Sequence, residues 1–166
     1  SSLYPVPGEE GGAVKMDVDK ILTPVMVRLL NDKNISGQTT LGDLLNNKID
    51  VYKGPRKPTG AKNPCFTIHV LSAPRDEDAK NYNGTLLINF YHDNYAAGNA
   101  AVEKMGPVTD RVEVLFDDRP LSIEGYTNYN LVVQEPLGPL FDHVWAPDEH
   151  YMSIRIRFGM IPKSIV

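Results

Sequence analysis

The stretch MSIRIRFGM, residues 152–160, alternates strictly between apolar and polar side chains. Such alternation is typical of a β-strand, because successive side chains point to opposite faces of a sheet. The apolar positions that share one face are Met152, Ile154, Ile156, Phe158 and Met160, and the polar positions opposite are Ser153, Arg155 and Arg157. The stretch predicts a sheet with one buried face and one face in water, which is common in antiparallel sheets.

Three earlier segments alternate in the same way, at residues 66–70, 86–90 and 129–133. Residues 49–52 form a shorter run that ends before a Gly-Pro pair, and they predict one more short strand. With the stretch at 152–160, these segments predict a mostly antiparallel sheet of about five strands.

Apolar residues recur at helical spacing in two regions. Between 17 and 31 they mark one helix face, with Asp17 or Asp19 as the N-cap. Small and apolar residues between 96 and 116 predict a second helix, which Gly106 and Pro107 break or kink. A further helical turn is predicted over 41–47. The predicted fold class is α+β, with two main helices on one face of the sheet.

Composition bounds the domain organisation and the class of protein. Of 166 residues, 42% are hydrophobic and 23% are charged, as in an ordinary folded domain. Residues 16–166 are predicted to form a single domain, and residues 1–15, rich in Pro and Gly, a flexible N-terminal arm. The net charge of -4 gives no global basic field for nucleic acid. No stretch suggests a membrane span or a signal peptide.

Candidate catalytic and metal-binding residues are few. The chain has no P-loop, nucleophile elbow or zinc-protease motif. Cys65, the only cysteine, begins an apolar strand and is interpreted as a small buried hydrophobe; without an intrachain disulfide the chain suits a reducing cytosol. Three carboxylate–histidine neighbours exist, at 92–93, 142–143 and 149–150, but adjacent strand residues point to opposite faces. We therefore expect no catalytic residue and no cofactor, with a metal-dependent hydrolase as the alternative.

Two segments are candidate interaction surfaces. Residues 54–64 form a Pro/Gly-rich loop with three basic residues, Arg56, Lys57 and Lys62, which suit either simple solvation, a phosphate or an acidic protein neighbour. Residues 136–150 are interpreted as a long loop with three prolines that nonetheless carries Leu140, Phe141, Val144 and Trp145. Apolar side chains in a protruding loop are common at protein interfaces.

The order of these elements resembles the tail terminator, or tail-completion (head–tail joining), proteins of long-tailed bacteriophages. The resemblance covers about residues 16–160. It is carried by the helix at 17–31, Val51-Tyr52-Lys53-Gly54 before the Pro-rich loop, Pro64-Cys65-Phe66-Thr67-Ile68, Gly84-Thr85-Leu86-Leu87-Ile88-Asn89-Phe90-Tyr91, Asp110-Arg111-Val112 and the strand at 152–158. Each of these is a short sequence segment rather than a diagnostic motif.

The resemblance implies a structural virion protein without catalytic residues. Such a protein forms a ring, typically a hexamer, that caps the tail tube, ends its polymerisation and joins the tail to the head. The implied partners are further copies of the chain, the tail tube protein and head-completion or neck proteins, with genomic DNA only passing through the lumen. The implied location is the virion tail or neck, after assembly in the host cytoplasm. A head-completion or connector protein of the neck is the close alternative, and a small binding module that uses residues 54–64 is another.

Overall fold

A computed structural model describes residues 17–73, 81–142 and 146–163, and the predicted N-terminal arm lies outside these ranges. The described helices are α1 (Asp19–Leu30), α2 (Leu41–Leu44) and α3 (Val102–Phe116). The described strands are β1 (Val51–Lys53), β2 (Cys65–Ser72), β3 (Tyr82–Asp93), β4 (Ser122–Ile123), β5 (Tyr126–Val133), β6 (Leu137–Asp142) and β7 (Ala146–Pro162).

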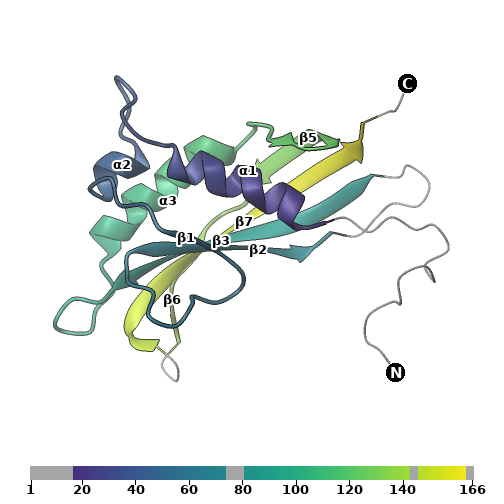
Figure 1. Ribbon diagram of the computed structural model, residues 1–166. Coiled ribbons are helices and arrows are strands. Elements are labelled where there is room, and N and C mark those ends of the chain that lie inside the picture. The colour runs from purple at the N-terminus through teal and green to yellow at the C-terminus, as the bar shows by residue number, and fades with distance from the viewer. Residues whose placement is uncertain (1–16, 74–80, 143–145, 164–166) are drawn as a thin grey trace, which may run out of the picture.

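The described strands form one mixed sheet (Figure 1). Six strands follow the order β1-β2-β3-β7-β5-β4, and β6 pairs with β7 beside this path, which makes seven in all. β1 runs parallel to β2, whereas the other pairs are antiparallel. The α+β prediction is therefore confirmed, but the prediction of about five mostly antiparallel strands with two main helices is corrected to a mixed sheet of seven strands with three helices.

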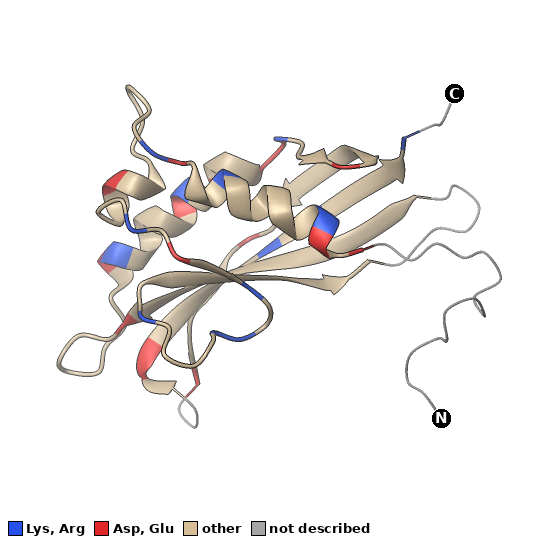
Figure 2. Ribbon diagram, in the orientation of Figure 1, with Lys and Arg blue, Asp and Glu red and all other residues tan. Residues whose placement is uncertain are grey.

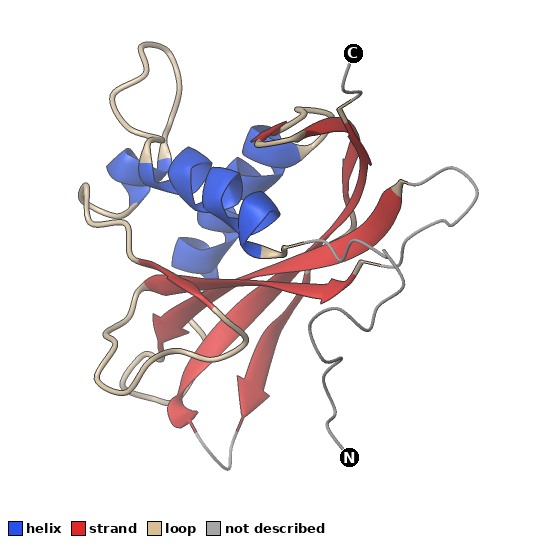
Figure 3. Cartoon of the chain, turned by 45° about the vertical axis from the view of Figure 1, so that its right-hand side comes forward, coloured by secondary structure: helices blue, strands red, loops and turns tan. Residues whose placement is uncertain are grey.

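The helices gather on one side of the sheet (Figure 3). Ile21, Val25 and Leu29 of α1 are fully buried, at the helical spacing that the sequence showed. They belong to the same core as Ile88 of β3 and Ile156 of β7. The alternating apolar side chains of the strands therefore face the helices, and their polar neighbours lie on the other face, here called the open face.

Helix α3 begins later than predicted and runs through Gly106 and Pro107 without a break. Residues 96–101 are not helical, because Gly98 takes a positive φ of 82° and its amide donates to Tyr95 O at 2.8 Å, which closes a turn. On either side of Pro107, the buried residues Met105, Val108 and Val112 pack on the core along one side of the helix. This packing helps the helix continue through a proline that lacks an amide donor.

The segment at 136–150 differs from the loop that its prolines suggested. Residues 137–142 form β6, which pairs antiparallel with the first part of β7. Pro139 is tolerated because β6 lies at an edge of the sheet, where one side of the strand needs no ladder hydrogen bonds. Phe141 and Leu140 are therefore strand residues, held in place by the pairing with β7.

A buried ion pair joins the helical layer to the loop before α2. Arg111 of α3 donates from Nε and Nη2 to the two carboxylate oxygens of Asp32, at 2.8 and 2.6 Å. These hydrogen bonds raise the pKa of the Arg111 guanidinium. Asp32 also accepts from Leu41 N at 2.7 Å, so one carboxylate fixes α2 and α3 together. Removing one partner of such a pair typically costs about 3–5 kcal/mol.

Candidate interaction surface

The two predicted interaction segments come close together at one end of the sheet, where Asp142 lines the same pocket as the 54–64 loop. The loop at 54–64 lies on the side of the sheet away from the helices (Figure 1), and it contacts β3 and β7. Lys57 forms an ion pair with Glu149 of β7, and its ammonium lies 4.9 Å from the ring centroid of Tyr91. Asn63 donates from its side chain to Glu149 and to Asp93, at 2.6 and 2.9 Å. The loop is therefore held against the sheet by polar contacts.

The three basic residues of the loop have different surroundings. The Lys57 side chain is only 20% exposed. Its charge is already paired within the chain with Glu149, whose side chain is 12% exposed. Arg56 and Lys62 are exposed. Of the three, these two are the ones available to a partner, and their part in an interface stays a prediction.

The apolar residues of the second segment flank the same region. Leu140 is half-buried beside Tyr151 of β7. Phe141 is 47% exposed, and its ring stacks on His150 with centroids 4.9 Å apart. Val144 and Trp145 lie outside the described residues. The structure thus places Leu140 and Phe141 at the same end of the sheet as the 54–64 loop.

A pocket of about 540 Å³ lies between the loop and the sheet. Its floor is formed by Asn89 and Tyr91 of β3 and Tyr151 of β7, and Arg56 and Asp142 are among the residues at its wall. Asn89 is only 6% exposed, and its Oδ1 has no hydrogen-bond partner among the described residues. A buried acceptor without a partner carries a desolvation cost.

Burial shifts the pKa of two groups of potential chemical interest, the Tyr91 hydroxyl in the pocket and the Cys65 thiol at the start of β2. Burial, as the main cause, raises the pKa of the Tyr91 hydroxyl, so this group stays neutral at ordinary pH. Cys65 is fully buried at the start of β2, and burial raises the pKa of its thiol to about 11. Neither group is an activated nucleophile, in agreement with the interpretation of Cys65 as a buried hydrophobe.

The carboxylate–histidine neighbours divide between the two faces of the sheet. Asp93 and Glu149 contact Asn63 on the open face. His150, next to Glu149, instead contacts Asn94 and Phe141, with Nδ1 2.5 Å from Asn94 Oδ1. Within 17–73, 81–142 and 146–163, no three His, Cys, Asp or Glu side chains converge as metal ligands would. His143, of the third pair, lies outside the described residues.

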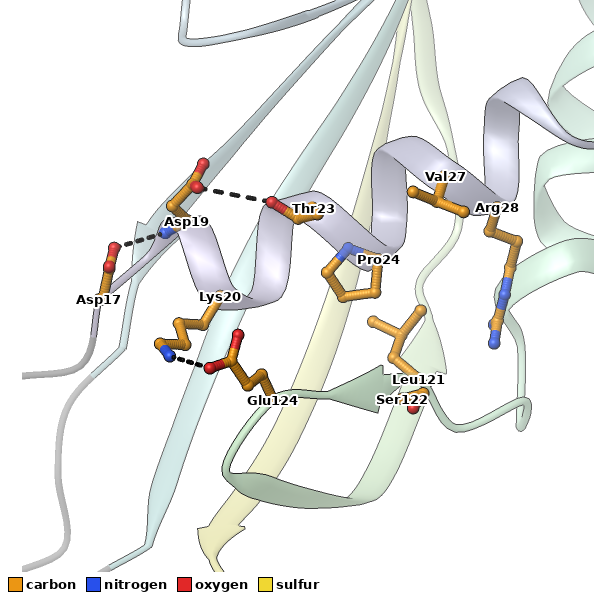
Figure 4. Close-up of a pocket in the computed structure, with 10 residues that line it drawn as sticks. All are labelled: Asp17, Asp19, Lys20, Thr23, Pro24, Val27, Arg28, Leu121, Ser122 and Glu124. Carbon is orange, nitrogen blue, oxygen red and sulfur yellow. Dashed lines mark hydrogen bonds and ion pairs between the residues drawn. The ribbon is translucent and has the colours of Figure 1, made fainter.

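A second hollow, of about 700 Å³, lies between α1 and the β4–β5 hairpin (Figure 4). Its charged groups already have partners within the chain. Lys20 forms an ion pair with Glu124 at 3.1 Å, and Asp19 forms one with Lys53 at 2.6 Å. Arg28 donates to the carbonyls of Leu115, Arg119 and Pro120, at 2.6–3.1 Å, where α3 ends. We therefore assign this hollow a structural role.

Several residues of the pocket were not singled out by the sequence. Asn89, Tyr91 and Tyr151 carry no motif, and they are brought together only by strand register. The one available signal was the place of Asn89 at a polar position of the alternating segment 86–90. Within the part of the chain that the structure describes, no helix is long and apolar enough to cross a membrane.

Comparison with known proteins gives a structural likeness without a sequence family. No family model and no curated protein matches the chain. One similar solved chain comes from a structure of the virion of a native gene transfer agent particle, with a TM-score of 0.53 and 10% identity, over 84% of this chain and 96% of that chain. Another solved chain has a TM-score of 0.45 and 14% identity, over 89% of this chain and 96% of that one. The protein thus shares the fold of a chain found in a virion.

Proposed function

We propose that this protein is a structural, non-enzymatic component of a virion. In this role it forms a ring with copies of itself at the end of the tail tube of a long-tailed bacteriophage, ends tube polymerisation and joins the tail to the head. The observation that carries the proposal is the fold shared with a virion chain, which extends over 84% of this protein and 96% of that chain. The resemblance of the sequence elements to tail terminator proteins supports the same role.

The geometry of the surface is compatible with assembly. The hairpin β6–β7 and the 54–64 loop present Phe141, Arg56 and Lys62 to solvent at one end of the sheet. A ring is built from heterologous contacts, in which one patch of each protomer meets a different patch of the next. The proposed partners are further copies of the chain, the tail tube protein and the neck proteins, while DNA passes through the lumen without being gripped.

Solution mass tests the self-association. Light scattering over a concentration series, at low ionic strength, should show a species well above the 18.5 kDa of the monomer. Negative-stain electron microscopy of that species should show closed rings with a central opening. Addition of the rings to purified tail tubes should stop their elongation.

Two results would contradict the proposal. A strict monomer that also leaves tube growth unchanged would remove the ring function. Rings that do not stop the elongation of tail tubes but bind to the portal vertex of isolated heads would favour the neck connector instead.

A further inference from the structure

The part of the open face that the 54–64 loop leaves uncovered is basic and apolar. Cross-strand register places Leu87 of β3 opposite Arg155 of β7, and Arg157 of β7 opposite Val132 of β5. Arg155, Arg157 and Val132 are exposed, Val132 at 45%. Within the described residues, neither arginine forms an ion pair. We call this surface, formed by Leu87, Val132, Arg155 and Arg157, the arginine face.

The exposed side of α3 has the opposite character. Glu103, Pro107, Asp110 and Val114 follow one another at steps of four, three and four residues, which places them along one line of the helix. Glu113 lies beside this line, and Val114 is 48% exposed. Among the described residues, Asp110 and Glu113 form no ion pair, and Lys104 is the one exposed cation of the helix. We call this surface the acidic face of α3.

The two faces lie on opposite sides of the molecule. The buried side of α3 packs on the core-facing side of the sheet, so its acidic face points away from the sheet, whereas the arginine face lies on the side that the helices leave uncovered (Figure 2 and Figure 3). A single protomer therefore cannot pair the two faces with each other. Two protomers can, when the acidic face of one meets the arginine face of the next.

We propose that the acidic face of α3 docks onto the arginine face of a second copy of this chain. The inference rests on the proposed self-assembly and specifies its interface. Arg155 and Arg157 meet Asp110 and Glu113, and Val114 packs among Leu87 and Val132. Because the two patches differ, the contact is heterologous and repeats from one protomer to the next, as ring closure requires.

A second copy fits the arginine face better than nucleic acid does. Leu87 and Val132 flank the arginines, and aliphatic side chains that become buried favour an apolar partner over a phosphate backbone. The chain as a whole carries a net charge of -4, which opposes binding to a polyanion. The acidic face of α3 supplies both the carboxylates and the valine that such a surface would accept.

Charge reversal tests the interface. The double variant Arg155→Glu/Arg157→Glu and the double variant Asp110→Lys/Glu113→Lys should each weaken self-association about tenfold or more, because like charges then meet across the contact. The control Arg119→Glu/Lys163→Glu reverses two exposed cations outside both faces, and it should assemble as the unmodified protein does. Light scattering gives the association, and far-UV circular dichroism with thermal unfolding confirms that each variant is folded.

Mixing the two variants provides the decisive step. In an equimolar mixture, each reversed arginine face can meet a reversed acidic face, and each unmodified face can meet an unmodified one, so assembly should return. A protein that assembles normally in both double variants would overturn the interface while leaving the ring function in place. Loss of duplex DNA binding by Arg155→Glu/Arg157→Glu, with unchanged mass, would assign the arginine face to nucleic acid instead. A parent protein that stays monomeric and also leaves tail-tube growth unchanged would overturn both proposals.

Discussion

Single residues show how burial decides the chemistry of a side chain. Cys65 is completely buried where β2 begins, and its Sγ lies 3.6 Å from Asn63 Oδ1. Burial disfavours the charged thiolate and raises the pKa of this group to about 11, well above that of an ordinary cysteine. The sequence showed only one cysteine before an apolar strand, and the structure gives the physical reason for its inertness.

We expect the Cys65 thiol to be almost unreactive in the folded protein. At pH 8 the raised pKa alone lowers the thiolate population about 100-fold relative to an unperturbed cysteine, and burial blocks access further. Labelling with a chromogenic disulfide reagent should be slow in buffer and complete within minutes in denaturant. Rapid stoichiometric labelling of the native protein at pH 8 would show that the β2 start is open to solvent.

Two glycines should respond in opposite directions to the same substitution. A Cβ at Gly84 would lie 2.3 Å from Ser72 O and 2.6 Å from Phe158 Cζ, so Gly84→Ala should destabilise the fold by about 1–3 kcal/mol. A Cβ at Gly106, inside α3, meets nothing within 4 Å. Gly106→Ala should therefore stabilise by roughly 0.5–1 kcal/mol through helix propensity. Urea denaturation measures both, and equal effects of the two changes would contradict the strand contact.

At the scale of elements, alternation and helical spacing predicted the regular strands and the first helix. The strand segments at 66–70, 86–90, 129–133 and 152–160 lie within β2, β3, β5 and β7, and the first helix coincides closely with α1. β6 was missed because Pro139 within it and Pro136 before it are typical of loops, whereas an edge strand tolerates a proline. The start of α3 was placed too early because the alanines at 96–101 have a high helix propensity, although the turn around Gly98 excludes them from the helix.

The pocket was less predictable than the strands. Lys57 was singled out as a basic loop residue, but nothing local in the sequence indicates its contact with Glu149, which lies 92 residues away. Asn89 and Tyr91 reach the pocket through the register of β3 with β2 and β7. Such contacts depend on which strands become neighbours, and periodicity within one segment does not contain that information.

The contact of Lys57 and Asn63 with Glu149 should govern how firmly the 54–64 loop is held. Glu149→Gln removes the negative charge that accepts both donors, so the loop should detach more often from the sheet. Limited proteolysis with trypsin should then cut after Arg56 and Lys62 several times faster. The matched change Glu124→Gln, at an exposed ion pair with Lys20, should leave these cuts unchanged. Equal cleavage rates in both variants would show that the loop is held by other contacts.

At the scale of the whole molecule, charge is divided between two opposite faces. The sheet and the helical layer lie between the arginine face and the acidic face of α3. The net charge of -4 therefore does not reveal that basic and acidic groups lie on opposite sides of the molecule. Two copies that bring identical faces together would place like charges opposite each other, which is unfavourable. Its charges favour a head-to-tail order, which continues until the copies close on themselves.

Self-association should therefore depend on ionic strength. Raising the salt from 50 to 500 mM shortens the Debye length from about 14 Å to about 4 Å and screens exposed charge pairs. The concentration at which half of the protein is assembled should rise, whereas in the Arg155→Glu/Arg157→Glu variant, in which like charges meet, it should fall. Sedimentation velocity at several salt concentrations measures this, and association of the unmodified protein that strengthens with salt would point to a purely apolar contact.

The central place of β7 also bears on the order of events during synthesis. β3 and β5 are neighbours only through β7, so before residues 146–162 are made the growing chain holds two separate strand groups, β1-β2-β3 and β4-β5. The helices would then cover an incomplete core, and the arginine face, which needs β3, β5 and β7 together, would not exist. A ribosome must therefore translate β7 before the protomer has the surface by which, in the proposed assembly, it would recognise another copy, and unfinished chains would lack that surface.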